Sequence, residues 1–327
     1  MKPFAYVNAG GEKDAIAALV PERGRVLPIA GGMDLLALMK DYIAQPDRLV
    51  NVKALDRTIR RGGDGSLRIG AAVTLTELAA HPEAARLYPA LTEAAAEVGT
   101  PQIRNVGTVG GNLNQRPRCW YFRNEEFHCL KKGGSRCFAV DGENQYHAIF
   151  GDGPCHIVHP SSLAVPAIAL DARFRVAGPA GEREVAAADY YVMPDRNLFG
   201  ETVLAPNELL THLILPAPGG ARTATYEVRF KQSHDWPLAM ASVALLMNGQ
   251  TVRAARIVMG AVAPIPWRSS AAEAALAGKR MSEEAAMAAA DAAVTGAKPM
   301  TGNAYKLQIA RTAVKRAILK AAGIKTV

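Results

Sequence analysis

The sequence has no apolar run approaching the roughly 18 to 20 residues that a helix needs to cross a bilayer. Residues 1–6 contain neither an apolar stretch nor a twin arginine, which predicts no export signal on this chain and a cytoplasmic location by default. No Ser-His-Asp arrangement, paired-carboxylate spacing or phosphate-binding P-loop stands out. We therefore expect no catalytic residues in the chain itself, so that any chemistry belongs to bound cofactors.

The composition is that of a globular protein with substantial cores. The chain has 327 residues, of which 49% are hydrophobic and 21% charged, and this length favours two or three domains. A net charge of +8 would suit nucleic acid, but the basic residues are spread out and accompany no nucleic-acid-binding motif. We expect no nucleic-acid partner.

Glycine and proline divide the chain into elements. A Gly31-Gly32 turn separates a predicted strand at 25–29 from a helical pattern at 34–40. This arrangement presents backbone N–H groups to a phosphate, although a tight turn that merely needs glycine explains the same residues. Further strands are predicted at 48–52, 67–73, 173–176 and 209–215, and helices at 12–20, 75–87 and 91–98.

The clearest domain boundary lies at 216–220, where proline and glycine cluster. Beyond it we expect strands at 225–230, 239–247 and 254–259 in an antiparallel sheet. Helices at 270–277, 282–294 and 304–319 follow, and Asn303 is the expected N-cap of the last.

All four cysteines, Cys119, Cys129, Cys137 and Cys155, fall in one short segment with the spacing C-x9-C-x7-C-x17-C. Two disulfides would require an oxidising compartment, and a chain with full cores does not need them. Structural zinc usually shows two cysteines two to four residues apart, which this segment lacks. An iron–sulfur cluster needs four thiolates without fixed spacing. The spacing alone leaves these three interpretations open.

Charged and aromatic residues surround the cysteines. Six basic residues against Glu125 and Glu126 give a local positive excess suited to an anionic centre: Arg116, Arg118, Arg123, Lys131, Lys132 and Arg136. The aromatic run at 120–122 could stack nucleotide bases, but we favour an apolar sheath that keeps water from a cluster. We interpret His128, His147, His156 and His159 as hydrogen-bonding loop residues rather than ligands.

Four motifs occur in order along nearly the whole chain: Ala30-Gly31-Gly32-Met33-Asp34-Leu35, Thr108-Val109-Gly110-Gly111-Asn112, Phe230-Lys231-Gln232, and the segment 260–268. Together they resemble the FAD-binding medium subunits of molybdenum hydroxylases, the xanthine dehydrogenase and carbon monoxide dehydrogenase family. The cysteine segment resembles an insert in the flavin subunits of PaoABC-type aldehyde oxidoreductases and of 4-hydroxybenzoyl-CoA reductase. Both carry an extra [4Fe-4S] cluster, and the residues at 118–123 and 146–149 look closer to the aldehyde enzyme.

The resemblance implies an α+β fold with two domains. A two-lobed FAD-binding domain like that of the vanillyl-alcohol oxidase (PCMH/VAO) type would cover residues 1–218, with lobes at about 1–55 and 56–218. A cysteine-rich [4Fe-4S] insert would occupy about 115–158. Residues 221–327 would form a carbon monoxide dehydrogenase flavoprotein-like domain, a three-stranded antiparallel sheet with helices.

The resemblance also implies the cofactor contacts. Backbone N–H groups of 27–35 and 108–112 would wrap the pyrophosphate and ribityl chain, and the Lys231 ammonium would stabilise negative charge on the reduced ring unless it is a solvent-facing strand lysine. The family usually has Ser-Asp where this chain has Ser161-Ser162, so one carboxylate contact is replaced by a hydroxyl. The FAD set is Leu27, Pro28, Ile29, Ala30, Gly31, Gly32, Met33, Asp34, Leu35, Thr108, Gly110, Gly111, Asn112, Ser162 and Lys231; the cluster set is Cys119, Cys129, Cys137 and Cys155.

By the same resemblance, the chain is an electron-transfer subunit of an oxidoreductase, most similar to an aldehyde oxidoreductase. A large partner would hold the molybdenum cofactor and a small partner the [2Fe-2S] clusters, with electrons leaving to an external acceptor. The complex would be periplasmic if a partner carried a twin-arginine signal. Alternatives are a 4-hydroxybenzoyl-CoA-reductase-like subunit, in which electrons run in reverse, a stand-alone flavin oxidase, and a metal-stabilised nucleic-acid-binding module.

Overall fold

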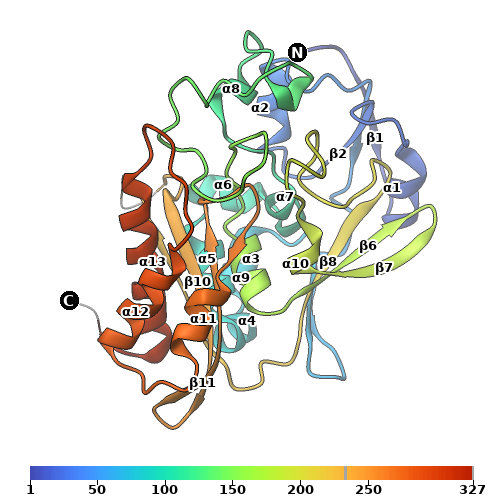
Figure 1. Cartoon of the computed structure of the whole chain (residues 1–327). Coiled ribbons are helices and arrows are strands. Elements are labelled where there is room, and N and C mark those ends of the chain that lie inside the picture. The colour runs from blue at the N-terminus through green and yellow to red at the C-terminus, as the bar shows by residue number, and fades with distance from the viewer. Residues whose placement is uncertain (232–233, 326–327) are drawn as a thin grey trace.

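The computed structural model describes residues 1–231 and 234–325, and its first lobe contains a small parallel sheet (Figure 1). The strands β1, β2 and β3 pair in the order β1-β3-β2. Their hydrophobic core includes Ala15, Val26 and Val50. The elements are β1 (Ala5–Asn8), α1 (Glu12–Ala18), β2 (Val26–Ile29), α2 (Leu35–Lys40) and β3 (Arg48–Asn51).

The second lobe contains a five-stranded antiparallel sheet in the order β4-β5-β8-β6-β7. Its strands are β4 (Ile59–Arg61), β5 (Leu67–Gly70), β6 (Arg173–Gly178), β7 (Gly181–Ala186) and β8 (Leu209–Leu215). Its helices are α3 (Leu75–Ala80), α4 (Pro82–Leu87), α5 (Pro89–Glu97), α6 (Pro101–Val106), α7 (Val109–Leu113), α9 (Ala164–Ala169) and α10 (Ala187–Tyr190). One large core joins this sheet to all of these helices except α6.

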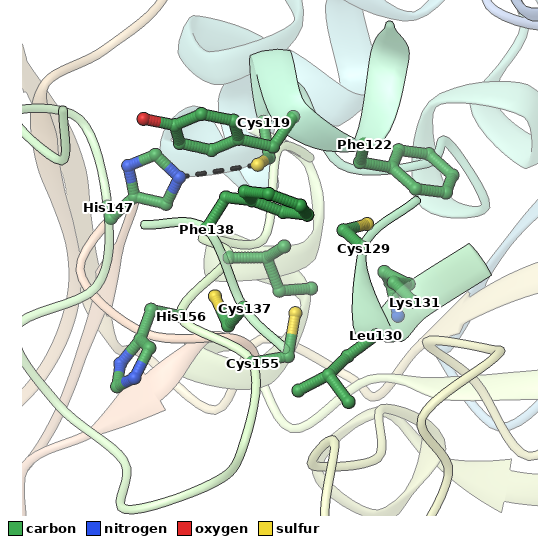
Figure 2. A pocket seen from close by; sticks show the side chains of 12 residues that line it. Cys119, Phe122, Cys129, Leu130, Lys131, Cys137, Phe138, His147, Cys155 and His156 are labelled. Atoms are coloured by element: carbon green, nitrogen blue, oxygen red, sulfur yellow. Dashed lines mark hydrogen bonds between the residues drawn. The ribbon is translucent and has the colours of Figure 1, made fainter. Parts of the chain in front are cut away.

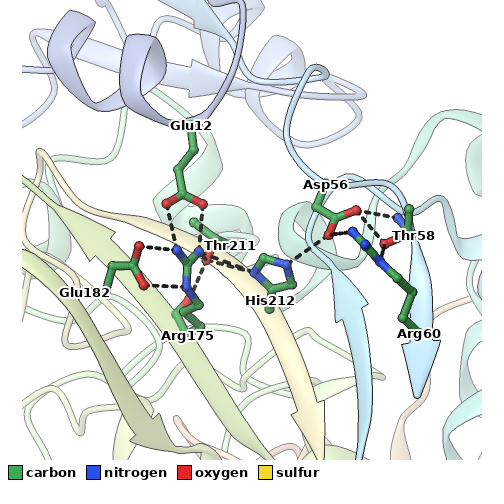
Figure 3. Close-up of polar contacts among 8 residues, drawn as sticks. All are labelled: Glu12, Asp56, Thr58, Arg60, Arg175, Glu182, Thr211 and His212. Atoms are coloured by element: carbon green, nitrogen blue, oxygen red, sulfur yellow. Dashed lines mark hydrogen bonds and ion pairs between the residues drawn. The ribbon is translucent and has the colours of Figure 1, made fainter. Parts of the chain in front are cut away.

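A polar network connects the two lobes (Figure 3). Glu12 at the start of α1 accepts hydrogen bonds of 2.7 and 2.9 Å from the Arg175 guanidinium on β6, which also pairs with Glu182. On the adjacent strand, the His212 Nε2 lies 3.2 Å from the Asp56 carboxylate. Side chains from distant parts of the sequence therefore fix the first lobe against the second.

The C-terminal region is a second antiparallel sheet covered by helices. Its strands, in the order β12-β11-β10-β9, are β9 (Arg222–Val228), β10 (Ala239–Asn248), β11 (Thr251–Gly260) and β12 (Trp267–Arg268). Its helices are α11 (Ser270–Leu276), α12 (Glu283–Ala293) and α13 (Tyr305–Ala322). In Figure 1, α13 lies against one side of β10, whereas α5 and α9 lie toward the other. This sheet therefore packs between its own helices and the second lobe.

The α+β architecture is confirmed, with three corrections to the sequence predictions. The C-terminal sheet has four strands rather than three, because the two-residue β12 is too short to produce an alternating pattern. The helix predicted over 75–87 is two helices, since Pro82 disfavours helical angles at His81. Asn303 does not cap α13, because its side-chain amide instead bonds the carbonyls of His147 and Ala148.

The cysteine segment contains little regular structure. It has one short helix, α8 (Trp120–Arg123), and a single 3₁₀ turn, η1 (Leu130–Lys132). Phe122 and Cys129 are buried against Leu38 of α2, which places the segment beside the first lobe (Figure 1). None of the helices in 1–231 and 234–325 combines the length and apolar character that crossing a membrane requires.

Candidate functional site

The two glycine turns lie at one cavity of about 460 Å³, here called the glycine cavity. This volume is within the range of roughly 300–1,000 Å³ typical of small-molecule sites. Fourteen of the fifteen residues expected to contact FAD line it: Leu27, Pro28, Ile29, Ala30, Gly31, Gly32, Met33, Asp34, Leu35, Thr108, Gly110, Gly111, Asn112 and Ser162. Two segments about 75 residues apart in the sequence therefore face the same space.

Glycine is required in both turns by close backbone approach. A Cβ on Gly31 would lie 2.0 Å from the Val106 carbonyl oxygen at the end of α6. A Cβ on Gly110 would lie 2.9 Å from the Cβ of Ala71. Gly32 also adopts a φ of 73°, which a side chain rarely tolerates. The Gly31 contact brings the first lobe against α6, whereas the Gly110 contact packs α7 against Ala71 within the second lobe.

Asn112 has a structural role that the motif did not reveal. Its buried Oδ1 accepts hydrogen bonds from the Ser161 hydroxyl at 2.7 Å and from the Leu163 amide at 3.3 Å. The Asn112 side chain therefore connects the second glycine turn to the segment that carries Ser162, which is itself buried in the cavity wall.

A second cavity of about 650 Å³ adjoins the first and is here called the aromatic cavity. Trp120, Tyr146, Phe230 and Trp236 contribute aromatic rings to it, and the exposed Lys231 lines it rather than the glycine cavity. Gln232 of the same motif lies outside the described residues. Four residues line both cavities, which makes the two spaces neighbours: Arg118, Asp235, Trp236 and Pro237.

Arg118 lies at the junction of these cavities. Its guanidinium is 3.2 Å from the Asp34 carboxylate and 4.4 Å from the centre of the Trp236 ring. Burial, followed by the positive charge of Arg123, lowers the pKa of Arg118 to about 10. The group stays charged at neutral pH, so a cation lies where the cavities meet.

The four cysteines line a third space, the cysteine cavity (Figure 2). All four are free thiols, which rules out the disulfide interpretation in this structure. The free volume is only about 10 Å³, room for about one water molecule. The remaining lining residues are mostly apolar or aromatic: Tyr121, Phe122, Leu130, Lys131, Phe138, His147, His156 and Ile157. Of the aromatic run at 120–122, from which we expected an apolar sheath, Tyr121 and Phe122 line this cavity, whereas Trp120 does not.

The cysteines are not arranged around a single ion. Within 1–231 and 234–325, no three histidine, cysteine or acidic side chains lie close enough together to hold one metal. Burial raises the pKa of Cys119 to about 12 and that of Cys155 to about 11, so both are neutral thiols near pH 7. Neutral buried thiols are weak nucleophiles, which argues against a nucleophilic role for these two cysteines.

Carboxylates from outside the segment neutralise much of its positive charge. Asp34 accepts from the Arg116 amide at 2.7 Å and from the Arg123 guanidinium at 2.5 Å. The nearly buried Glu201 lies 2.7 Å from both the Arg116 Nε and the Lys131 Nζ. The positive excess counted from the sequence is therefore halved, and two acidic residues fix the segment to the rest of the protein.

His147 lies between the cysteine and aromatic cavities. Its Nε2 is 3.3 Å from the Cys119 sulfur (Figure 2). Burial, followed by the charge of Lys306, lowers the pKa of His147 to about 4, which keeps the imidazole neutral. Three residues line both cavities: Cys119, His147 and Ile157. They form a shared wall.

Several cavity residues were not identified from the sequence. Gln115, Arg118, His234, Asp235 and Trp236 line the glycine cavity. The signal available for the last three was their position a few residues after the Phe230-Lys231 motif. Nothing local indicated that Asp34 would pair with arginines more than 80 residues away.

The chain matches two family descriptions in succession. Residues 2–218 match "FAD binding domain in molybdopterin dehydrogenase", and residues 224–321 match "CO dehydrogenase flavoprotein C-terminal domain".

Individual relatives match over nearly the full length. The chain is 37% identical to the aldehyde oxidoreductase FAD-binding subunit PaoB of Escherichia coli K12, covering 98% of this chain and 99% of that protein. It is 30% identical to the carbon monoxide dehydrogenase medium chain of Hydrogenophaga pseudoflava, covering 96% of each. Among solved structures, a chain of carbon monoxide dehydrogenase from H. pseudoflava, in a form lacking the Mo-pyranopterin moiety, superposes with a TM-score of 0.77 at 30% identity, covering 99% of this chain and 98% of that one.

Proposed function

The chain belongs to the family of FAD-binding subunits of molybdopterin dehydrogenases, and on that premise we propose that it is the FAD- and [4Fe-4S]-carrying subunit of a heterotrimeric molybdenum hydroxylase. It passes electrons from [2Fe-2S] clusters on a small partner to an external acceptor. Substrate is oxidised at the molybdenum cofactor of a large partner. The 37% identity to an aldehyde oxidoreductase subunit favours an aldehyde as that substrate.

The observation that carries the FAD assignment is the convergence of both glycine turns on one cavity. Backbone N–H groups of 27–35 and 108–112 would hold the pyrophosphate and ribityl chain, as at other glycine-rich phosphate sites. The flavin ring would extend into the aromatic cavity, where Lys231 and Arg118 supply positive charge. FAD, when bound, supplies two-electron redox chemistry, and these cations would stabilise negative charge on the reduced ring.

Three features support a [4Fe-4S] cluster on Cys119, Cys129, Cys137 and Cys155. All four thiols are unpaired, they line one cavity, and that cavity has an apolar sheath. In a four-iron cluster each thiolate binds a different iron, so the sulfurs stand farther apart than around one ion, consistent with the lack of a single-ion site among the described residues. The sheath must open to admit the cluster, because the free volume is about 10 Å³.

Spectroscopy and metal analysis of the purified full-length chain test this proposal. Flavin absorbance with about four irons and four acid-labile sulfides per chain supports it. Flavin without iron favours a stand-alone flavin oxidase, and zinc without flavin favours a nucleic-acid-binding module with steeply salt-dependent binding. Aldehyde oxidation by the isolated chain would contradict the assignment, because the substrate site belongs to a partner.

Substitution of single cysteines tests the two cofactors separately. Cys137→Ser should remove or degrade the cluster, measured as iron per chain, while FAD stays bound. Ser135→Ala, an exposed residue of the same segment, is the control and should change neither cofactor. Simultaneous loss of FAD and iron in Cys137→Ser would contradict independent binding and show that the sites form one structural unit.

The direction of electron flow and the cellular compartment are tested with the chain in complex with its partners. Expression of the chain with its partners distinguishes an aldehyde oxidoreductase from a 4-hydroxybenzoyl-CoA-reductase-like enzyme by whether substrate is oxidised or reduced. Cell fractionation of the same complex tests the cytoplasmic location, and a twin-arginine signal on a partner would instead carry the folded complex to the periplasm.

A further inference from the structure

His147 contacts one cysteine sulfur in a defined orientation. Its Nε2 lies 3.3 Å from the Cys119 sulfur, and its Nδ1 is buried without a hydrogen-bond partner among the described residues. A neutral imidazole carries a single N–H. If that hydrogen were on Nδ1, a buried donor would have no acceptor, which is costly. The contacts therefore favour an Nε2–H directed at the Cys119 sulfur.

The surroundings hold this ring in place. The His147 amide donates to the Asn144 carbonyl at 3.0 Å, and the His147 carbonyl accepts from Asn303 and Lys306, each at 3.1 Å. The ring centre lies 5.5 Å from Trp120, in an edge-to-face arrangement. A side chain held by its backbone and by neighbouring rings is a pre-oriented donor for a nearby ligand atom.

We propose that His147 is a positioning residue that donates an Nε2–H hydrogen bond to the Cys119 sulfur and thereby raises the reduction potential of the [4Fe-4S] cluster. This inference rests on the proposed function, which places a cluster on the four cysteines. Reduction adds negative charge that is shared with the thiolate sulfurs, and a hydrogen-bond donor stabilises the more negative state.

The hydrogen bond from His147 is placed to act on one particular cysteine ligand. Among the four cysteines, Cys119 alone also lines the aromatic cavity, together with His147. His156 also lines the cysteine cavity, yet no hydrogen bond in the described part of the chain joins it to a sulfur. His147 thus acts on the ligand in the wall that faces the proposed flavin ring, and His156 provides a matched control.

Redox titration of the full-length chain, monitored by electron paramagnetic resonance, tests the inference. His147→Leu removes the donor, His147→Gln replaces it with an amide N–H, and His156→Leu changes the neighbouring histidine. At the wild-type midpoint, His147→Leu should raise the ratio of oxidised to reduced cluster at least threefold, a shift of about 28 mV toward negative potential at 59 mV per tenfold. His147→Gln should recover most of this shift, and His156→Leu should stay near wild type.

Iron and sulfide analysis accompanies each titration. An unchanged midpoint in a fully loaded His147→Leu chain overturns the inference but leaves the proposed cluster intact. Equal shifts in His147→Leu and His156→Leu also overturn it, because they would reflect general loosening of the sheath. A wild-type chain without iron overturns the cluster itself, and the inference with it.

Discussion

Gly31→Ala should weaken FAD binding through one backbone contact. The new Cβ would lie 2.0 Å from the Val106 carbonyl oxygen, whereas Cβ contacts under 3.0 Å are essentially never seen, so the turn and α6 must separate by about 1 Å. Both groups line or border the glycine cavity, and neither is a flexible side-chain end. Overpacking of this kind costs about 1–3 kcal/mol, which corresponds to about a 5- to 150-fold loss of affinity if the strain falls on the bound state.

Titration of the flavin-free chain with FAD, followed by flavin fluorescence, measures this loss, and a thermal melt separates it from unfolding. Gly63→Ala is the matched control, because Gly63 has a Cβ position free of neighbours and no positive φ. The control should bind FAD like the wild type. If Gly31→Ala keeps an FAD affinity within about twofold of wild type at an unchanged melting temperature, the clash does not govern the site and the reasoning fails.

Two further predictions concern stability. Glu201→Gln should lower the free energy of unfolding by about 3–5 kcal/mol in urea, because the buried Lys131 ammonium loses its counter-ion. Adding Lys131→Met should recover most of that loss, and no recovery would exclude Lys131 as the cause. Burial alone would raise the pKa of Asp56, but hydrogen bonds from Thr58 and His212 outweigh it and hold that pKa below 3.8. The stability that this carboxylate contributes is therefore present above about pH 4 and is lost as the pH falls through its folded pKa. Asp56→Asn should flatten the acid side of the urea stability profile, and parallel profiles for the two proteins would contradict this.

Local sequence signals predicted individual helices, strands and the two glycine turns, whereas the resemblance to a known family implied the architecture and a cofactor site shared by both turns. The predicted strand that became β8, with apolar residues on both sides of Thr211-His212, and the alanine-rich pattern that became α12 depend only on neighbouring residues. The turns at Gly31 and Gly110 were recognisable because close backbone approach leaves glycine in the sequence. The families matched at 2–218 and 224–321 confirm the resemblance that these motifs suggested.

Contacts between distant segments could not be predicted in this way. From its neighbours in the sequence, Asp34 is expected at the start of a helix, yet its carboxylate binds arginines of the cysteine segment. From its neighbours in the sequence, Asn303 is expected to cap the last helix, yet its side chain bonds backbone carbonyls more than 150 residues earlier in the chain. Such pairings depend on which surfaces the fold brings together, and a short sequence pattern contains no information about that.

Asn303 and Lys306 make the final shape of the cysteine segment depend on residues that are synthesised much later. Both hold the carbonyl of His147, and Lys306 also reaches the carbonyls of Tyr146 and Ala261 from the start of the last helix. Ribosomes release a chain from its N-terminus, so all four cysteines emerge well before the two residues that fix the end of their segment. The cysteine segment can reach its final shape only after the start of α13 has been synthesised. A product truncated before Asn303 would lack both residues, and the end of the cysteine segment at His147 would lose the contacts that hold it.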